Sequence, residues 1–521
     1  MLFNSFLFIF AFLPTTLLVF LATARLSHVL AAGWLTVASL FFYAWWDPAY
    51  VVLLLASIPF NYALGLGIAR AAEQGRRPRA RQLLVVALVV NLLVLGYFKY
   101  ADFLVGSVNT VAGTAWTIDR VVLPLGISFF TFTQISFLVD SFRGQVSHYH
   151  FVHYVLFVTY FPHLIAGPIL HHKEMIPQFR RLSTDRPDAD DAVVGLTIFV
   201  IGLFKKVLIA DTVGLYSTPA FTAAANGEPL SVAAAWSGVL AYTFQLYFDF
   251  SGYSDMAIGL SRLFGIHLPL NFNSPYQATS IIEFWRRWHM TLSRFLRDYL
   301  YVPLGGSRCH PARRYANLLV TMLLGGLWHG AGWTFVVWGG LHGLYLIVNH
   351  GWRAVRRAWV GGPPRSTWWG RHVSRLVTFL AVVVAWVFFR AASFDAALGM
   401  LKGMSGANGF APPRYFADVA TSMVFVPILD DLGWTVSPVG LMVCILAVLL
   451  AIVWFAPNTH RLMGRYDRAL DPYPAATLAE PTTTLRWRPT RAMAVLAGAV
   501  FFACLLGLLT DKPSEFLYFQ F

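Results

Sequence analysis

Apolar blocks of about 20 residues recur along the whole chain, and this recurrence limits what the chain can fold into. The hydrocarbon core of a bilayer needs about 20 apolar residues for each crossing helix. Because some blocks overlap or run short, the sequence predicts an all-α polytopic membrane protein with roughly ten to twelve transmembrane helices. The candidate blocks are residues 5–24, 29–46, 49–69, 83–103, 120–140, 151–170, 192–214, 232–264, 314–338, 333–351, 374–394, 437–456 and 491–510.

Composition excludes a soluble single-core protein. Of the 521 residues, 57% are hydrophobic and only 12% are charged, whereas about 25% of the residues in ordinary soluble domains are charged. The longer polar stretches, at about 171–191, 395–436 and 457–490, are interpreted as loops. We therefore expect residues 1–521 to form a single integral-membrane domain.

The net charge of +14 does not indicate nucleic-acid binding, because the basic residues fall in short clusters between apolar blocks. The spans alternate consistently when the loops 76–81, 171–186, 353–376 and 461–491 are placed in the cytoplasm. Both termini, including the tail FLYFQF (516–521), then lie outside. The first block is expected to remain as a helix rather than to be a cleaved signal peptide.

Gly, Pro, His and Arg interrupt the apolar pattern near residues 161–168, 285–304 and 325–343. Irregular backbone at membrane depth is tolerated only where protein or a polar cavity surrounds it. These segments predict re-entrant or interfacial pieces in addition to the full spans.

Two histidines, His329 and His342, lie in the apolar run LLGGLWHGAGWTFVVWGGLHG (323–343), which contains no acidic residue. An ionisable side chain at bilayer depth costs about 2.5–3.5 kcal/mol, so such residues are functional candidates. A helix from Arg314 places His329 about 22 Å from that basic loop. Desolvation favours the neutral imidazole, which can accept a proton. The alternative is a core histidine bonded to a helix carbonyl. The glycines of this run favour close helix packing.

The segment EFWRRWHMTLSRFLRDYLY (283–301) alternates charged and aromatic residues and predicts an amphipathic helix. One interpretation is an interfacial helix on the cytoplasmic surface, with its arginines on headgroups. The other is a basic mouth in which Arg286 and Arg287 hold an anionic acyl donor while His289 faces inward. The two interpretations do not exclude each other.

Buried charges precede this segment. Asp249 and Asp255 lie in an apolar span, and we expect structural ion pairs between them and Arg286, Arg287 and Arg297. Asn273 follows in the motif NFNSPY (271–276). Lys205 and Lys206 lie within another span, where they either pair with acidic groups or line a polar cavity.

Several enzyme classes lose support because their motifs are absent. The sequence contains no GxSxG elbow, P-loop, HExxH motif or strand-following GxGxxG. Cys309, Cys444 and Cys504 are too few and too scattered for a disulfide framework or a cysteine-based zinc site. The histidines lack acidic or cysteine neighbours in the sequence, so no metal site is predicted.

Ordered motifs nearly from end to end resemble those of the membrane-bound O-acyltransferase superfamily, in particular its bacterial alginate O-acetyltransferase branch. The motifs are FYAWW (42–46), GYFKYADF (96–103), LPLGISFFTF (123–132), FPHLIAGP (161–168), QLYFDFSGYSDMAIG (245–259), EFWRRWHMTLSRFLRDYLY, GGLWHGA (325–331), WVFFRA (386–391) and FLYFQF.

The resemblance implies a ring of helices around a central channel, with His329 as general base and His289 as the second catalytic position. It implies transfer of an acyl group, acetyl in this branch, from a cytoplasmic donor across the bacterial inner membrane for O-acetylation of an exopolysaccharide such as alginate. The donor would be acetyl-CoA or an acylated carrier, without a bound cofactor, and a periplasmic acetyltransferase would complete the transfer. The residues expected to bind the donor or line the channel are Trp328, Asn273, Trp285, Arg286, Arg287, Asp249 and His342.

Two other classes were weighed against this enzyme. In a proton-coupled transporter or channel, the intramembrane His, Asp and Lys residues would form a path, but the paired repeats typical of transporters are not found. A structural membrane subunit would tolerate the loss of His329. The sequence does not specify the acceptor, the acyl group, the immediate donor, the oligomeric state or the division of roles between His289 and His329.

Overall fold

The computed structural model of this protein is built from helices. It describes residues 1–521 except 120, 147–148, 183–188, 361–366, 422–430, 432–435, 465, 467–468, 471, 473–486, 510–515 and 518–521. Among the described residues no strand occurs, and the backbone forms one isolated bridge, between Pro269 and Leu470. Most of the 461–491 loop and the end of the FLYFQF tail therefore lie outside the described part of the chain.

The chain divides into two compact units, whereas a single domain was expected. Unit 1 comprises residues 1–203, 253–270 and 463–503, and unit 2 comprises residues 204–252, 271–462 and 504–521. The long helix α11 (Val232–Leu263) contributes to both units, and so does α22 (Arg491–Leu508). The expectation of one functional membrane domain stays a prediction.

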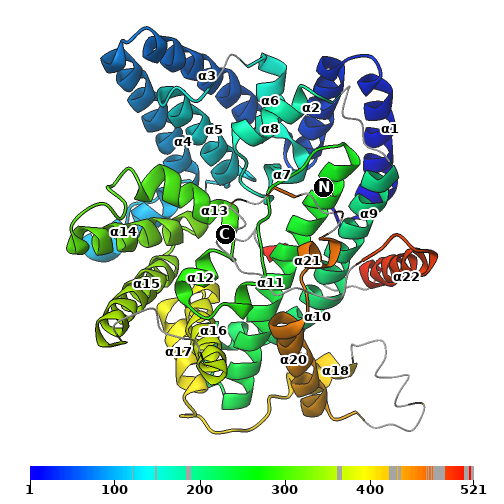
Figure 1. The fold of residues 1–521 in the computed structure, drawn as a ribbon. Helices are drawn as coiled ribbons and strands as arrows, with labels where there is room; N and C mark the ends of the chain where they lie inside the picture. Colours follow the sequence, from blue (N-terminus) through cyan, green and yellow to red (C-terminus); the bar gives the residue numbers. More distant parts are fainter. Residues whose placement is uncertain are drawn as a thin grey trace. The chain divides into compact units, whose positions relative to one another are not determined.

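Unit 1 is a helical layer in which α3 packs against α4 and α5, and α2 packs against α1 and α6 (Figure 1). Amides hold α3, α4 and α5 together, because Asn61 bonds to both Asn91 and Gln134 at 2.7–3.2 Å. The elements of this unit are η1 (Phe8–Phe12), α1 (Leu13–Ala24), α2 (His28–Ala44), α3 (Pro48–Glu73), α4 (Arg77–Ala112), α5 (Ile127–Phe142), α6 (Phe151–Thr159), α7 (Phe161–Leu164), α8 (His172–Phe179) and α9 (Ala189–Phe204), which ends at the boundary with unit 2. The short helix α21 (Thr459–Met463) lies in unit 2 except for Met463.

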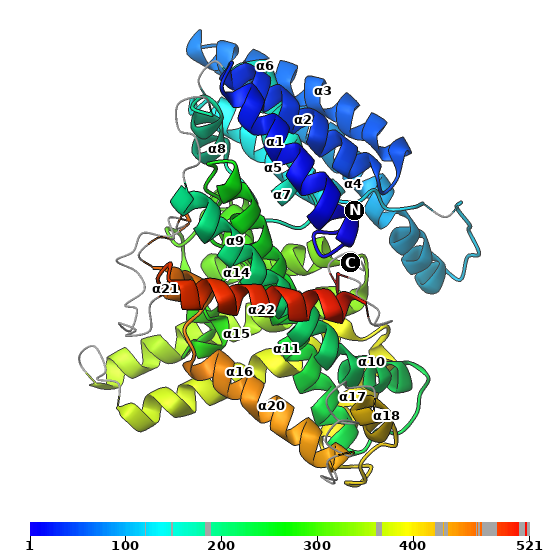
Figure 2. The ribbon, with the colours of Figure 1, turned by 90° about the vertical axis from the view of Figure 1, so that its right-hand side faces the viewer.

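Unit 2 carries the residues on which the sequence analysis concentrated. Its helices α14 and α15 pack along each other, and α15 also contacts α12 and α16 (Figures 1 and 2). Its elements are η2 (Lys205–Ala210), α10 (Asp211–Ala225), η3 (Pro275–Gln277), α12 (Ile281–Trp285), α13 (Met290–Leu296), η4 (Arg297–Tyr301), α14 (Pro311–His329), α15 (Trp333–Val360), α16 (Trp368–Arg390), α17 (Phe394–Met404), α18 (Tyr415–Thr421) and α20 (Pro438–Phe455).

Local sequence explains where many helices begin. The hydroxyl of Ser27 accepts a hydrogen bond from the amide of Val29 at the start of α2, and the carboxylate of Asp47 accepts one from Ala49 before α3. Such caps satisfy amides that lack a partner within the helix. Proline follows the cap of α3, α14 and α20, where its missing N–H has no cost.

The all-helical membrane class is confirmed. Within the described part of the chain, six helices are long and apolar enough to cross a bilayer, namely Pro48–Glu73, Arg77–Ala112, Ala189–Ala225, Trp368–Arg390, Pro438–Phe455 and Arg491–Leu508, and three shorter apolar helices cover Phe8–Ala24, His28–Ala44 and Ile127–Phe142. Helices α11, α14 and α15 are also 18 residues or longer but carry Asp249, His329 and His342. The count of ten to twelve crossings stays a prediction.

Two apolar blocks are divided rather than continuous. The block 151–170 is split into α6 and α7 around Tyr160. The overlapping blocks 314–338 and 333–351 become α14 and α15, which are separated at Gly330, whose backbone is extended. A Cβ at Gly330 would lie only 2.1 Å from the Phe335 ring, so this sharp return needs glycine.

The prediction of one amphipathic helix over 283–301 is wrong. The segment contains α12, a break at His289, α13 and then the π-helical turn η4. His289 has φ 42°, and among the described non-glycine residues only Ser274 shares a positive φ. Tertiary hydrogen bonds override the helical pattern at this break, because the amides of Met290 and Asn273 bond to the carbonyls of Asn271 and Arg287.

Candidate active site

Unit 2 buries three histidines close to one another. His289 and His342 are fully buried, and His329 is 4% exposed. His329 is the last residue of α14, His342 lies on α15, and His289 lies between α12 and α13. Close packing of α14 on α15 fixes the positions of His329 and His342. A Cβ at Gly339 would lie only 2.2 Å from the carbonyl oxygen of Met322. The glycine packing expected from the sequence is confirmed at this crossing.

Asn271 holds the ring of His289 in place. The Nδ1 atom of His289 lies 2.9 Å from Oδ1 of Asn271, and the hydroxyl of Thr291 donates to the same oxygen. Because an amide oxygen only accepts, Nδ1 of the neutral ring carries the proton. The lone pair of His289 is therefore on Nε2, where it can accept a proton.

Burial sets the charge state of His289. The residue lies in the break between two short helices, and desolvation lowers its pKa to about 3. The imidazole is consequently neutral at physiological pH. Phe250 packs edge-on against the ring at 4.8 Å between centroids.

His329 lies within an aromatic enclosure next to His289. The two imidazole centroids are 6.3 Å apart. Trp328 and Trp338 each lie 5.0 Å from the ring of His329, and Phe389 lies 5.2 Å from it, all three edge-on. Aromatic walls exclude water and strengthen electrostatic interactions inside the enclosure.

His342 lies on the other side of the Trp338 indole. Its ring centroid is 4.8 Å from that of Trp338, and its Nδ1 accepts a hydrogen bond from Nε1 of Trp285 at 3.3 Å. Nε2 of His342 therefore carries the proton. This N–H and the N–H of Trp338 are buried without a hydrogen-bond partner in the described part of the chain. The enclosure thus offers two N–H donors to an oxygen.

The remaining residues predicted to bind the donor or line the channel lie partly in the enclosure and partly outside it. Trp328 and Trp285 contact the histidines of the enclosure. Asn273 and Arg287 join the two segments that flank His289, because the Arg287 guanidinium donates to the Asn273 carbonyl at 3.1 Å. Arg286 is exposed, whereas Arg287 is buried.

Asp249 does not pair with the arginines predicted for it. Its Oδ1 lies 2.7 Å from Nζ of Lys206, which also lies 2.7 Å from Asp211. Arg287 instead pairs with Glu283 at 2.9 Å, and Arg297 pairs with Asp298 at 2.7 Å. Glu283 and Arg287 have the i,i+4 spacing of helix neighbours, and Arg297 and Asp298 are adjacent in the sequence. Folding of η2 against α11 places Lys206 beside Asp249. Of the two alternatives for Lys206, pairing with acidic groups and lining a polar cavity, the structure shows pairing.

The other oxygen of Asp249 accepts a hydrogen bond from the amide of Leu517 at 3.1 Å. The neighbouring Phe516 packs 6.3 Å from Phe250, which in turn contacts His289. The role expected of Asp249 in donor binding or channel lining stays a prediction. In this structure the residue holds the backbone at Leu517.

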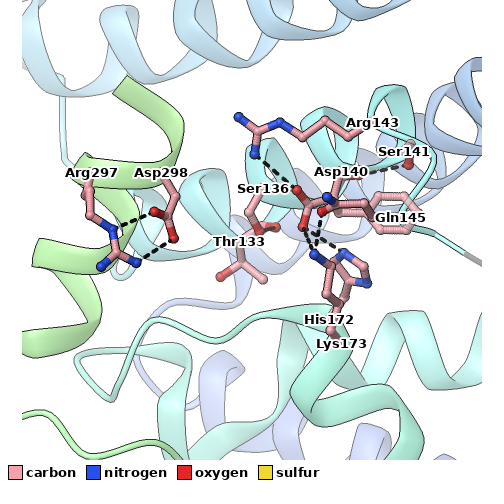
Figure 3. Close-up of polar contacts among 11 residues, drawn as sticks. Thr133, Ser136, Asp140, Ser141, Arg143, Gln145, His172, Lys173, Arg297 and Asp298 are labelled. Carbon is pink, nitrogen blue, oxygen red and sulfur yellow. Dashed lines mark hydrogen bonds and ion pairs between the residues drawn. The ribbon is translucent and has the colours of Figure 1, made fainter. Parts of the chain in front are cut away.

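A second buried polar cluster, in unit 1, was not found from the sequence (Figure 3). Asp140, 1% exposed, accepts from Nε2 of His172 at 3.0 Å and lies 3.5 Å from Arg143 and 3.7 Å from Lys173. The hydroxyl of Tyr149 lies 2.9 Å from Nδ1 of His172. The available signal was Asp140 at the end of an otherwise apolar block, followed by the pair His171 and His172.

Two residues of the enclosure were also missed. Asn271 was noted only as part of an asparagine-containing motif, and Trp338 only as part of an aromatic run. Trp338 precedes His342 by four residues, which places both on one helix face. Among the described residues, no group of three or more His, Cys, Asp and Glu side chains could hold a metal ion.

Comparison with known proteins agrees with this geometry. The profile described as MBOAT, membrane-bound O-acyltransferase family, matches residues 80–389, which include His289, His329 and His342. The chain belongs to this family. It is therefore an acyltransferase by family, and the three buried histidines lie within the matched region.

Named relatives include two kinds of O-acetylating protein. The peptidoglycan O-acetyltransferase of Helicobacter pylori is 45% identical over 436 residues, covering 78% of this chain and 80% of the relative. The probable alginate O-acetylase AlgI of Azotobacter vinelandii is 39% identical over 533 residues and covers both chains fully. The teichoic acid D-alanyltransferase of Streptococcus thermophilus is 26% identical, covering 51% of this chain and 68% of the relative.

Proposed function

We propose that this membrane-bound O-acyltransferase moves an acetyl group from a cytoplasmic donor across the bacterial inner membrane for O-acetylation of an exopolysaccharide such as alginate. The full-length similarity to an alginate O-acetylase supports the choice of acyl group and acceptor. The helices long and apolar enough to span a bilayer support the location. Both termini lie on the periplasmic side.

The observation that carries the mechanism is the buried pair of His289 and His329, with imidazole centroids 6.3 Å apart beside aromatic rings. His329 acts as the general base that removes a proton from the attacking hydroxyl or thiol. Asn271 holds the Nδ1 proton of His289, so Nε2 can accept the single O–H or S–H hydrogen bond of the incoming nucleophile before that proton passes to His329. Of the two roles considered for His289, orienting the nucleophile therefore has more support than stabilising an oxyanion.

Attack on a thioester or ester carbonyl builds negative charge on its oxygen, and donors placed for that charge lower the barrier. The buried N–H groups of Trp338 and His342 are suited to this task because they have no other acceptor in the described part of the chain. Trp285 fixes the tautomer of His342 that makes its Nε2 a donor.

The donor is a thioester, either acetyl-CoA or an acylated carrier, and no bound cofactor takes part. A periplasmic acetyltransferase of the SGNH type completes transfer to the polymer. A second acceptor, peptidoglycan, deserves a direct comparison because a relative named as a peptidoglycan O-acetyltransferase is 45% identical to this chain.

The test is transfer of labelled acetyl from acetyl-CoA, or from an acylated carrier, by purified protein in liposomes. Alginate and peptidoglycan are supplied separately, each with the periplasmic partner. We expect label on one polymer with the wild type and none with folded His329→Ala. Equal transfer by both proteins would remove His329 from the mechanism. Absence of transfer by the wild type with every donor would refute the acetyltransferase assignment.

A further inference from the structure

The backbone is strained at His289, in the break between α12 and α13 (Figure 1). Its φ of 42° lies in the left-handed region, where the Cβ of a non-glycine residue crowds the following carbonyl oxygen. Among the described non-glycine residues, only Ser274 shares this conformation, with φ 46°. Such strain persists only where the surrounding structure holds the residue. The groups that hold the backbone at His289 therefore also decide where its imidazole lies.

Arg287, two residues before His289, holds this break from the side of α12. The residue is 5% exposed. Its Nη1 donates to the carbonyl of Asn273 at 3.1 Å, and its own carbonyl accepts a hydrogen bond from the amide of Asn273 at 2.9 Å. These reciprocal bonds tie the segment that contains Asn271 to the segment that contains His289. Because Asn271 bonds to the imidazole of His289, the same tie sets the position of the ring.

A carboxylate fixes the guanidinium of Arg287. Its Nε and Nη2 lie 3.0 and 2.9 Å from Oε1 of Glu283. The other oxygen of Glu283 accepts hydrogen bonds from the amide and the hydroxyl of Thr279 at 2.8 and 2.9 Å. Every guanidinium nitrogen of Arg287 thus has an acceptor inside the protein, and its charge is balanced. An arginine held in this way is suited to fixing the backbone rather than to binding an anionic ligand.

The second left-handed residue, Ser274, is held from a distant part of the chain. The side-chain amide of Asn458 donates to Oδ1 of Asn273 at 2.8 Å and to the hydroxyl of Ser274 at 3.0 Å. Asn458 directly precedes α21, and its Oδ1 accepts a hydrogen bond from the amide of Arg461 at 2.8 Å, which fixes the orientation of the side chain. Hydrogen bonds therefore connect Asn458 with Arg287 through Asn273.

We propose that Arg287 and Asn458 are positioning residues for acyl transfer. They hold the backbone at His289 in its left-handed conformation and so keep the imidazole on Asn271, with Nε2 directed at the nucleophile. Both residues act through His289 and not by contact with the acyl group. This inference rests on the proposed function, because it takes His289 to act in acyl transfer. It gives Arg287 a role different from the donor binding predicted from the sequence.

Initial-rate kinetics on purified protein in liposomes tests this role with Arg287→Lys. Lysine keeps the positive charge for Glu283 but lacks the planar fork that also reaches the Asn273 carbonyl. We expect kcat per folded molecule to fall about tenfold or more at an unchanged KM for the acetyl donor, because a misplaced catalytic group slows the chemical step. Arg297→Gln, which removes an exposed arginine paired with its neighbour, is the matched control and should turn over like the wild type. A raised KM with an unchanged kcat would overturn the inference and indicate that Arg287 binds the donor.

A double-mutant cycle separates positioning from a general loss of structure. If Arg287 acts by placing His289 on Asn271, Arg287→Lys should lower kcat by less than about threefold in an Asn271→Ala background. Equal fold losses in both backgrounds would overturn the inference, because a loss of folded protein multiplies in every background. Asn458→Ala leaves the ion pair of Arg287 intact and provides the test if Arg287→Lys does not fold. We expect it to lower kcat several-fold at constant KM, and a wild-type kcat would overturn the role of Asn458.

Solid-state NMR of protein labelled with nitrogen-15 histidine gives a readout that requires no turnover. The signals of His289 are identified by their loss in His289→Gln, and in the wild type they should show a protonated Nδ1 and a bare Nε2. Arg287→Lys should add the other tautomer, whereas Arg297→Gln should not. Unchanged His289 signals in folded Arg287→Lys would overturn the inference and leave the acetyltransferase standing. Altered signals in a protein that transfers acetyl to no acceptor would support the placement of His289 by Arg287 and refute the proposed function.

Discussion

The two buried histidine clusters of this protein differ in the residues that contact their imidazole rings. In unit 1, His172 is bonded to the buried carboxylate of Asp140, with Arg143 and Lys173 nearby (Figure 3). In unit 2, His289 is bonded to a neutral amide, and aromatic rings surround His329. A carboxylate partner favours the charged imidazolium, whereas a neutral amide and aromatic rings favour the neutral imidazole, which is the form that accepts a proton.

This contrast predicts a role in stability for the first cluster and a role in chemistry for the second. Figure 3 shows the side chains of Asp140, His172 and Lys173 converging from α5 and α8. Removing one member of such a buried network leaves an uncompensated charge. Removing a histidine of unit 2 leaves no buried charge, so its effect should appear in the rate rather than in stability.

The largest effect is expected for His289→Gln, a change that keeps the volume and a donor toward Asn271 but removes the Nε2 lone pair. The acyl-transfer rate should fall by about 10²- to 10⁴-fold, because that is the usual contribution of a positioned proton acceptor. Turnover and the thermal midpoint are measured on the same preparation. His150→Ala, which alters an exposed histidine, is the control. Wild-type turnover by His289→Gln would remove this residue from the mechanism.

Asp140→Ala should mainly affect stability. Loss of the carboxylate leaves the buried Nε2 of His172 without its acceptor, at a cost of about 1–3 kcal/mol, whereas the exposed Arg143 and Lys173 lose little. Denaturant unfolding in detergent measures this loss, and kcat per folded molecule should be unchanged. Asp418→Ala, at an exposed position, should unfold like the wild type. A variant that is fully stable but inactive would move the chemistry to unit 1 and reverse the comparison.

Asn271→Ala should lower kcat by about tenfold while KM stays close to the wild-type value, because the His289 ring loses the acceptor that fixes its tautomer. Asn271→Asp keeps an oxygen acceptor but gives His289 a carboxylate partner, which favours the imidazolium, so its rate should stay below that of the wild type. Initial-rate kinetics on both variants gives the answer. Equal rates for Asn271→Ala and the wild type would show that the hydrogen bond to Nδ1 does not position the ring.

The smallest effect concerns pH and stability. The pKa of His289 is lowered to about 3 in the folded protein, whereas it is about 6.5 in the unfolded chain. When the pH falls below about 6.5, the unfolded chain binds a proton that the folded protein does not bind, so the folded state loses stability. The slope from this group is at most about 1.4 kcal/mol per pH unit. His289→Gln should therefore show a shallower fall in unfolding free energy between pH 6.5 and 5. Identical slopes would mean that His289 is protonated in the folded state.

Much of the candidate site could be identified from the sequence because polar residues in apolar runs are conspicuous. His329 and His342 were found in this way, and the family resemblance added His289. The partner of Asp249 could not be found, because Lys206 lies 43 positions away in sequence and only the folding of α11 against η2 brings them together. The break at His289 was hidden by a segment whose pattern is that of a continuous helix.

The sequence by itself determined that this chain forms helices in a membrane, because hydropathy over 20-residue windows and the caps of individual helices are local properties. It also indicated which side chains are costly to bury in a membrane and are therefore candidates for a function. Only the tertiary structure decided which of them meet, since the Asn271–His289 bond and the 6.3 Å histidine pair join residues that are far apart in the chain. Proton transfer depends on such distances, and no local pattern encodes them.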